Sequence, residues 1–272
     1  MISLILATLG RYEELDRCIE SILSQINVKY EILVVDQNRP EFLSNLREKY
    51  SDVRIVWKNI STVGLSNARN EGLALARYNR IALIDDDSVL QNPRHLQNAI
   101  SWLERYDFVS GICVDFNGVD ANKFFPTNDV VISSSNIFSC IISPCFFFNL
   151  KKDAVFDVRL GVGAYFGSGE ETDFAITLII DGGTGYFTRS LSVIHPEGDG
   201  KQLSKSRRYK YALGVGALMR KRSLFFGPRM VIRKILGPLL TSLRHLSNGK
   251  LVHAKLSVID FLGRVYGYLV FR

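Results

Sequence analysis

Four short apolar segments set the strongest limit on what this chain can fold into. They lie at residues 2–9, 30–36, 53–57 and 80–84. Their length and their content of Ile, Leu and Val are typical of buried strands. Residues 12–24 and 64–76 carry apolar side chains at helical spacing, and the segment as far as residue 87 alternates strand with helix. This alternation predicts an α/β fold with a mainly parallel central sheet flanked by helices.

Polar side chains fall at the carboxyl ends of three of these predicted strands. Thr8 ends the first strand, Asp36 ends the second, and Asp85, Asp86 and Asp87 follow the fourth. In sheets of this kind ligands bind just beyond the carboxyl ends of the strands. The sequence therefore predicts a binding site at this edge of the sheet.

The three consecutive aspartates favour a metal site. Neighbouring carboxylates at a strand end repel one another unless a cation binds between them. Mg²⁺ and Mn²⁺ prefer such oxygen ligands and often share them with substrate phosphates. A solvated acidic turn is the alternative, but the position of the triplet after a buried strand, level with Asp36, favours the metal.

Two further motifs lie in the second half of the chain. A glycine-rich loop at 160–169 precedes Glu170, Glu171 and Asp173, acids that suit either the start of a helix or a general base for an acceptor hydroxyl. His195 follows a strand predicted near 184–188 and precedes Pro196. A lone histidine is more often structural, but a neutral imidazole here could complete the metal site.

The C-terminal region differs from the rest of the chain in charge and pattern. Residues 200–272 contain 16 of the 34 bases and one of the 27 acids, Asp260, so they carry about +15, and the preceding residues carry about −8. Helical patterns are predicted at 202–222, 228–246 and 251–269. We therefore divide the chain into a catalytic domain, 1–200, and a basic helical region, 201–272.

The basic helices have two interpretations. Basic amphipathic helices bind anionic membrane surfaces, and a helical subdomain with a solvated basic face is the equally weighted alternative. The sequence contains no nucleic-acid-binding motif, so we expect no nucleic-acid partner.

Composition limits the class of protein and its expected location. The chain is 47% hydrophobic and 22% charged, which is typical of a globular fold. Its four cysteines form no CxxC pair, which favours buried free thiols in a reducing compartment. The residues after Met1 lack the marks of a signal peptide, and no apolar run approaches the roughly 20 residues of a membrane span. We therefore expect a cytoplasmic protein, either soluble or peripheral. The basic helices add the expectation that it is peripheral on the inner face of the plasma membrane.

The motifs together resemble family 2 glycosyltransferases over about residues 1–200. The segments that carry the resemblance are Ala7-Thr8-Leu9-Gly10-Arg11, Val34-Val35-Asp36, Gly64 to Gly72 (GLSNARNEG), Ile84-Asp85-Asp86-Asp87 and Gly169 to Asp173 (GEETD). The GLSNARNEG segment, similar to the family's G-x-S-x-ARN-x-G helix, is the most specific. The resemblance implies a glycosyltransferase A fold with a C-terminal helical extension.

The resemblance also implies roles for individual residues. Those implied for the donor pocket are Thr8, Arg11 and Asp36 on the nucleoside, Arg69 and Asn70 in support, and Asp85 and Asp86 beside ribose or donor sugar. Asp87 would hold Mn²⁺ or Mg²⁺ through the diphosphate, with Asp85 and His195 beside it. Glu171 stands where the family has an aspartate base, so Glu170 and Asp173 remain alternatives for the base.

The implied activity is inverting, metal-dependent transfer of a sugar from a nucleotide donor, UDP- or dTDP-sugar, to a hydroxyl of a glycan acceptor. The expected acceptor is linked to polyprenyl diphosphate, in synthesis of a surface polysaccharide such as the O-antigen of lipopolysaccharide. A polyprenyl-phosphate glycosyl synthase and a non-catalytic member that binds nucleotide or glycan are the alternatives.

Overall fold

The computed structural model describes residues 1–122, 124–151, 154–195 and 204–272, and the chain forms two compact units. The first unit comprises Met1–Val63, Asn67–Phe156 and Thr177–Gly200, and the second Gly64–Ser66, Asp157–Ile176 and Lys201–Arg272. The domain boundary predicted at residue 200 lies outside the described residues. Pro196, which follows His195, also lies outside them. Residues 157–176 belong with the C-terminal helices.

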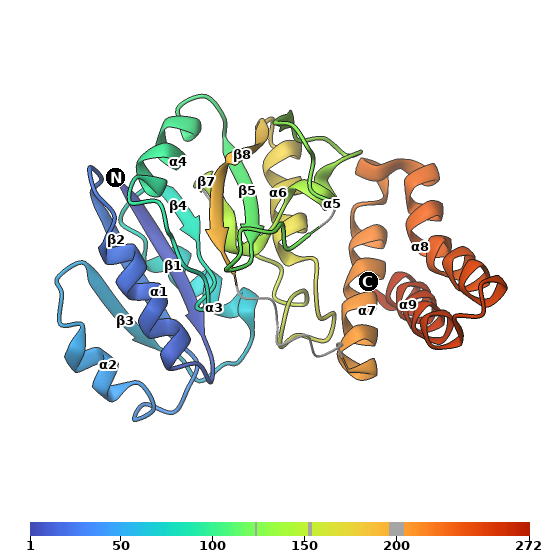
Figure 1. The fold of residues 1–272 in the computed structure, drawn as a ribbon, viewed down its shortest axis with the longest axis horizontal. Coiled ribbons are helices and arrows are strands. Elements are labelled where there is room, and N and C mark those ends of the chain that lie inside the picture. Colours follow the sequence, from blue (N-terminus) through green and yellow to red (C-terminus); the bar gives the residue numbers. More distant parts are fainter. Residues whose placement is uncertain (123, 152–153, 196–203) are drawn as a thin grey trace. The chain divides into compact units, whose positions relative to one another are not determined.

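An eight-stranded sheet forms the centre of the first unit in the described part of the chain, in the order β3-β2-β1-β4-β7-β5-β8-β6 (Figure 1). The strands are β1 (Ile2–Thr8), β2 (Tyr30–Asp36), β3 (Ile55–Asn59), β4 (Arg80–Leu83), β5 (Phe108–Val114), β6 (Val130–Val131), β7 (Phe146–Asn149) and β8 (Gly185–Ile194). Strands β1 to β4 pair in parallel, as do β5 and β8, and β7 joins the two parallel groups in antiparallel orientation. The expected mainly parallel α/β sheet is confirmed.

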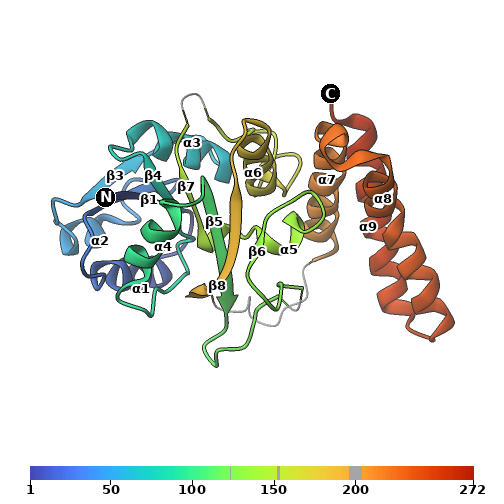
Figure 2. The same ribbon diagram turned by 90° about the horizontal axis from the view of Figure 1, so that it is seen from above.

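Helices cover both faces of this sheet. Helices α1 (Glu13–Leu23) and α4 (His95–Leu103) lie on one face, and α3 (Leu65–Leu75) lies on the other (Figure 2). Helix α2 (Ser44–Lys49) lies between β2 and β3 in the sequence, as the predicted alternation of strands and helices requires. Gly72 lets α3 approach β1 closely, because a Cβ at that position would meet Cγ2 of Ile5 at 2.5 Å.

The register of the sheet brings the predicted site residues to one edge. Thr8 is paired with Asp36 across β1 and β2, and Leu83 of β4 is paired with Ile5 of β1. Asp85 therefore emerges two residues beyond β4, at the same edge as Thr8 and Asp36. Side chains of β1 and β2 are almost entirely buried, which explains why both strands are apolar up to that edge.

The apolar runs of residues 130–149 predict β-structure, but only part of this segment forms strands. Helix α5 (Ile137–Cys140) and the 3₁₀ helix η1 (Ser143–Cys145) separate β6 from β7. Pro144 lies within η1, where its missing N–H and fixed φ suit a helical turn and would interrupt a ladder. The four cysteines are buried and free, as expected.

The second unit is built around α7 (Lys205–Lys221), which packs against α8 (Ser223–Ser247) and α9 (Leu251–Val270). Helix α6 (Glu170–Ile180) begins in this unit. A small core joins the glycine-rich segment to the C-terminal helices, and its members are Leu160, Phe166, Leu213, Ala217 and Phe271. Among the described residues, no helix combines the length and the hydropathy needed to cross a membrane.

Candidate active site

The three aspartates after β4 are held by Arg11 and Ser143. Asp86 pairs with Arg11, whose Nη1 lies 2.5 Å from Oδ1 of Asp86 and 2.7 Å from Oδ2 of Asp87. Oδ1 of Asp85 accepts a 3.1 Å hydrogen bond from the hydroxyl of Ser143. The turn therefore directs Asp86 toward Arg11 and leaves one oxygen each of Asp85 and Asp87 for a further partner.

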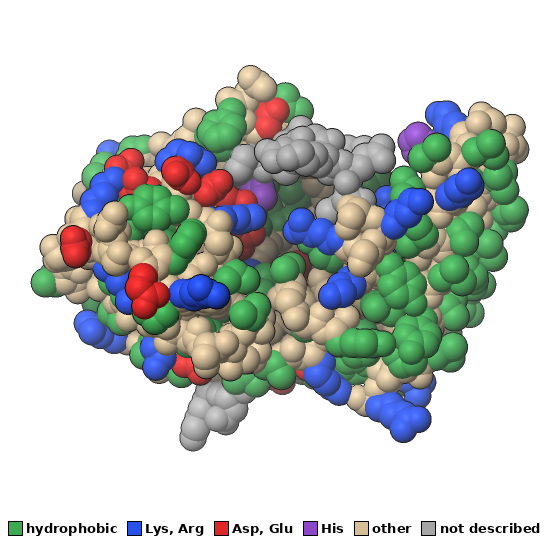
Figure 3. All heavy atoms as spheres, turned by 90° about the horizontal axis from the view of Figure 1, so that it is seen from below, with side chains coloured by type: hydrophobic (Ala, Val, Ile, Leu, Met, Phe, Trp, Pro, Cys, Tyr) green, Lys and Arg blue, Asp and Glu red, His purple; other side chains and the backbone are tan. Residues whose placement is uncertain are grey.

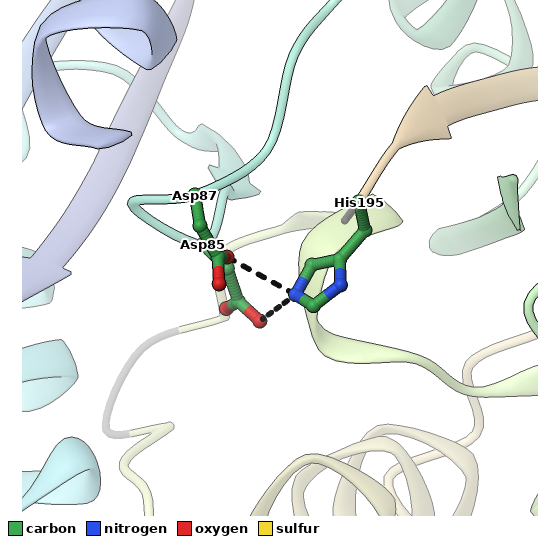
Figure 4. Close-up of side chains that lie close together, drawn as sticks. All are labelled: Asp85, Asp87 and His195. Atoms are coloured by element: carbon green, nitrogen blue, oxygen red, sulfur yellow. Dashed lines mark ion pairs between the residues drawn. The ribbon is translucent and has the colours of Figure 1, made fainter. Parts of the chain in front are cut away.

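That partner is His195, which follows β8. A two-residue bridge, with hydrogen bonds of 2.8 and 3.0 Å between Val89 and Ile194, fixes the end of β8 beside the aspartate turn. Nε2 of His195 lies 3.0 Å from Oδ1 of Asp87 and 3.9 Å from Oδ2 of Asp85 (Figure 4). Ligand atoms of Asp85, Asp87 and His195 all lie within 4.8 Å of one another.

This arrangement fits a divalent cation. Two carboxylate oxygens and one imidazole nitrogen are a donor set that Mn²⁺ and Mg²⁺ accept. Oδ1 of Asp87 is buried and lies 3.0 Å from Nε2 of His195. A buried carboxylate oxygen is costly unless a positive charge lies beside it.

Electrostatic shifts reflect the same cluster. Burial alone would raise the pKa of Asp87, but His195 and Arg11 hold it below its usual value. Burial alone would lower the pKa of His195, but Asp87 and Asp85 raise it above its usual value. Burial raises the pKa of Asp86 despite the neighbouring Arg11. The cluster therefore favours the charged forms of both Asp87 and His195.

Arg69 supports this cluster from α3. Its side chain is 3% exposed, its Nη2 lies 3.4 Å from Oδ1 of Asp85, and it donates a short hydrogen bond to the hydroxyl of Ser143. Its guanidinium also lies 5.6 Å from the ring centre of Phe156. Arg69 and Ser143 together orient Asp85. Ser143 was missed from the sequence, because a serine before a proline carries no signal of such a role.

Asn70, next on α3, binds a different segment. Its amide nitrogen donates to the carbonyl of Phe156 at 3.0 Å, and its Oδ1 accepts from the N–H of Phe156 at 2.8 Å. Both ends of the side-chain amide are thus engaged by the backbone of one residue. Asn70 fixes the chain at Phe156, against which Arg69 stacks.

Asp36 is fully enclosed at the end of β2. Its Oδ1 accepts hydrogen bonds of 2.8 Å from both the backbone and side-chain nitrogens of Asn38, and its Oδ2 lies 2.7 Å from Nη2 of Arg47. Asn38 in turn accepts a 2.6 Å hydrogen bond from the N–H of Gly10. Thr8, opposite Asp36, is also buried. Asn38 and Arg47 are therefore members of this edge that the sequence motifs did not identify.

An open hollow lies beside these residues. Its volume is about 520 Å³, and it is lined by Leu9, Gln37, Asn38, Arg39, Glu41 and Phe42. Its floor combines the apolar Leu9 and Phe42 with polar amides. Such a lining suits a flat, partly polar group such as a nucleoside base.

The predicted base candidates begin helix α6, in the second unit. Glu170 is 4% exposed, and a Cβ on Gly161, which has φ of +105°, would lie 3.0 Å from its Cδ. Glu171 is half-buried. The carboxylate of Asp173 accepts hydrogen bonds from Nε of Arg222 at 2.6 Å and from Nζ of Lys221 at 2.8 Å.

Comparison with known proteins places this architecture in a family. The family "Glycosyl transferase family 2" matches residues 3–166. A protein of Bacillus subtilis (strain 168), named as the uncharacterized glycosyltransferase EpsJ, is 32% identical over 80 residues, which is 29% of this chain and 23% of that protein. The match therefore spans less than a quarter of that relative.

Solved structures share the fold over almost the whole chain. The mannosyltransferase PcManGT from Pyrobaculum calidifontis, in complex with GDP-Man and Mn²⁺, matches with a TM-score of 0.70 and 15% identity, over 97% of this chain and 87% of that one. S. aureus TarS 1–349 in complex with UDP-GlcNAc matches with a TM-score of 0.61 and 14% identity, over 98% and 89%. These likenesses confirm the expected glycosyltransferase A fold. Since the family match covers more than half of the chain, the protein belongs to glycosyl transferase family 2.

Proposed function

We propose that the protein transfers a sugar from a nucleotide-diphosphate donor to a hydroxyl of a glycan acceptor, with inversion at the anomeric carbon. The observation that carries the proposal is the convergence of Asp85, Asp87 and His195 at the carboxyl edge of the sheet. Ligands of doubly wound sheets bind at such an edge. Membership of the family supports the same reaction class.

Asp85, Asp87 and His195 would hold Mn²⁺ or Mg²⁺. A divalent ion bound there neutralises charge on a diphosphate leaving group. The buried Oδ1 of Asp87, which faces Nε2 of His195 at 3.0 Å, supports this assignment, and PcManGT, which shares the fold, is solved with GDP-Man and Mn²⁺. Arg69 and Ser143 keep Asp85 in place for this role.

The donor's nucleoside would lie along the edge formed by Thr8, Arg11 and Asp36. The carboxylate of Asp36 is covered by Asn38 and Arg47, and Asn38 also lines the hollow. The guanidinium of Arg11 is 42% exposed while anchored on Asp86 and Asp87, and it can reach a phosphate or ribose. UDP- and dTDP-sugars are the donors we propose.

Glu171 is the proposed general base. A general base needs a carboxylate oxygen that can reach the acceptor hydroxyl. Both oxygens of Asp173 are instead held by Lys221 and Arg222. Glu170 is the alternative for the base. The deprotonated acceptor oxygen attacks the anomeric carbon opposite the leaving diphosphate, and this single displacement inverts the configuration.

We further propose a polyprenyl-diphosphate-linked glycan as acceptor, in synthesis of a surface polysaccharide such as an O-antigen. The enzyme would then work as a peripheral protein at the inner face of the plasma membrane. The support for this location is the charge of the C-terminal helices, whose sole acid is Asp260.

The test combines nucleotide binding with donor consumption. UDP, dTDP, GDP and CDP are each added with and without Mn²⁺, and the melting temperature is recorded. We expect a Mn²⁺-dependent increase with one nucleotide, and slow hydrolysis of the matching nucleotide-sugar. Asp87→Ala should abolish both, whereas Asp52→Ala, in the turn before β3, should not. Wild-type turnover by Asp87→Ala would overturn the metal assignment, and nucleotide binding without turnover would favour a non-catalytic member.

A further inference from the structure

The hairpin formed by α8 and α9 has its side chains distributed in an unusual way. The buried face of α9 consists of small residues, Ala254, Ser257, Gly263 and Gly267. Gly267 lies so close to α7 that a Cβ there would meet the carbonyl oxygen of Leu213 at 2.2 Å. Small residues permit this close packing of helices, and they leave the large apolar side chains to point outward.

The outward side chains of α8 form a continuous apolar stripe. Its members are Ile232, Leu236, Leu239, Leu240, Leu243 and Leu246, exposed by 37 to 67%. Successive members lie one, three or four residues apart, which places all six on one side of the helix. The opposite side of α8 contains the buried Val231, Ile235 and Pro238.

Helix α9 continues this surface. Val258, Leu262, Tyr266 and Leu269 are exposed by 38, 52, 45 and 70%, again at steps of three and four residues. We call the stripe on α8 and these four residues of α9 the outer apolar face. Figure 3 shows hydrophobic side chains over the C-terminal helices, with Lys and Arg among them. A large exposed apolar surface of this kind indicates a site of contact with a membrane or with another molecule.

The charges around the outer apolar face are of one sign. Arg229, Arg233 and Arg244 are exposed on α8, and Lys250 and Lys255 are exposed at the turn and on α9. The one acid of this region, Asp260, pairs with Arg208 of α7, whose Nε donates to it at 2.7 Å. The outer apolar face is therefore bordered by cations alone among the described C-terminal residues.

This charge pattern selects between the possible occupants. A second copy of the chain would bring two sets of cations together and would be repelled. An anionic bilayer offers both an acyl region for leucines and headgroup charges for Arg and Lys. Because the other side of the hairpin packs on α7, only one face is available, and the helices would lie in the plane of the interface.

We propose that the outer apolar face of the α8–α9 hairpin docks on an anionic phospholipid bilayer, with its leucines at the acyl boundary and Arg229, Arg233 and Arg244 at the headgroups. This deepens the proposed function and rests on it for its purpose, since a lipid-linked acceptor is found at such a surface. It places the contact on α8 and α9 and not on α7, whose Leu213, Ala217 and Met219 are buried.

The test is co-sedimentation of the full chain with vesicles, without donor or acceptor. Vesicles are made of phosphatidylcholine alone or of equal parts phosphatidylcholine and phosphatidylglycerol. We expect binding at least about tenfold tighter to the anionic vesicles. Leu236→Ser/Leu240→Ser/Leu243→Ser should weaken it by about tenfold or more. Arg229→Glu/Arg233→Glu should remove the preference for anionic vesicles.

A matched triple variant supplies the control. Ile26, Val53 and Val119 are exposed by 45, 95 and 61% in the first unit, and replacing all three by Ser should leave vesicle binding unchanged. A wild-type chain that ignores anionic vesicles, or a leucine variant that binds like wild type, would overturn the proposal. A lipid-free dimer that the leucine substitutions dissociate would assign the face to a second copy and overturn it as well.

Failure of docking and failure of the proposed catalysis give different results. Vesicle binding is measured without donor, and nucleotide-dependent melting is measured without lipid. A chain that binds vesicles but never consumes a nucleotide-sugar retains the docking face and loses the catalytic proposal. A chain that consumes the nucleotide-sugar but does not bind vesicles retains the catalytic proposal and loses the docking proposal.

Discussion

Arg222 donates a hydrogen bond of 2.6 Å from its Nε to Oδ1 of Asp173, and thereby joins the end of α7 to the first turn of α6. Lys221 contacts the other oxygen of the same carboxylate at 2.8 Å and also reaches Asp157 at 2.6 Å. The side chain of Asp173 is only 4% exposed. Asp173 is therefore part of an ion-pair network that connects the GEETD motif to the C-terminal helices.

Replacing Asp173 should cost stability. Asp173→Asn leaves Lys221 and Arg222 without their shared counter-charge, and loss of one partner of a buried ion pair costs about 3 kcal/mol. Glu171→Gln, two residues earlier, should remove sugar transfer, because an amide cannot accept the proton of the acceptor hydroxyl. Urea unfolding and donor turnover of both variants make the comparison. A fully stable Asp173→Asn without turnover would transfer the role of base to Asp173.

Metal binding should depend on Asp87 and His195 and not on Asp86. Asp87→Asn and His195→Ala each remove a proposed ligand and should weaken Mn²⁺ binding by about tenfold or more, measured by calorimetry without nucleotide. Asp86→Asn is the control, because its carboxylate faces Arg11 at 2.5 Å and belongs to no ligand cluster among the described residues. Equal losses in all three variants would mean that the acidic turn attracts cations only by its charge.

Asn70 should matter through the backbone of Phe156. Asn70→Ala leaves the N–H and carbonyl of Phe156 without the two hydrogen bonds of 2.8 and 3.0 Å, so it should lower the free energy of unfolding by about 2 kcal/mol. Asn70→Asp keeps the acceptor for the N–H of Phe156 and loses the donor to its carbonyl. Its free energy of unfolding should therefore lie between those of wild type and Asn70→Ala. Unfolding in urea ranks the three proteins. An unchanged Asn70→Ala would show that the Phe156 segment is held by other contacts.

His95 should make stability depend on pH. It is 1% exposed at the start of α4, and burial lowers its pKa to about 4 from an ordinary value near 6.5. The unfolded chain therefore binds a proton between these values and the folded chain does not. The contribution of neutral His95 to the free energy of unfolding is therefore fully present above about pH 6.5. It falls by up to about 1.4 kcal/mol per pH unit as the pH is lowered toward 4.

His95→Gln isolates this contribution. Carboxylates also titrate at acid pH, so the quantity to compare is the slope of unfolding free energy between about pH 7 and 5 in wild type and variant. The variant should show a smaller slope, whatever its stability at pH 7. Parallel slopes would mean that His95 takes up its proton in the folded state too.

Two glycines of the C-terminal helices should respond in opposite directions to Ala. Gly267→Ala places a Cβ 2.2 Å from the carbonyl oxygen of Leu213 and must separate α9 from α7. Gly237 of α8 has no atom within 4 Å of its Cβ position, so Gly237→Ala should gain about 0.5–1 kcal/mol of helix propensity. In thermal melting, the midpoint temperature of Gly267→Ala should be lower than that of wild type, and the midpoint of Gly237→Ala should be higher.

The sequence by itself determined the sheet and the edge at which the site lies. Apolar runs that end at Thr8, Asp36 and Asp85 are a local pattern, and burial of a strand on both faces produces that pattern directly. The strand β1 and the helix α3 follow their predicted ranges to within a residue or two. The secondary structure of residues 130–149 could not be predicted as well, because short apolar runs are typical of both strands and buried helical turns. Part of this region forms α5 and η1.

Only the tertiary structure decided which partners the polar groups meet. The bridge between Val89 and Ile194 brings His195 to Asp87 across more than a hundred residues, and no local pattern encodes that distance. The enclosure of Asp36 by Arg47 depends in the same way on how the chain returns to the sheet edge. Periodicity shows that a helix has an apolar side, but whether that side is buried depends on its neighbours. Packing of small residues on α7 buries one side of the α8–α9 hairpin and leaves its leucines exposed.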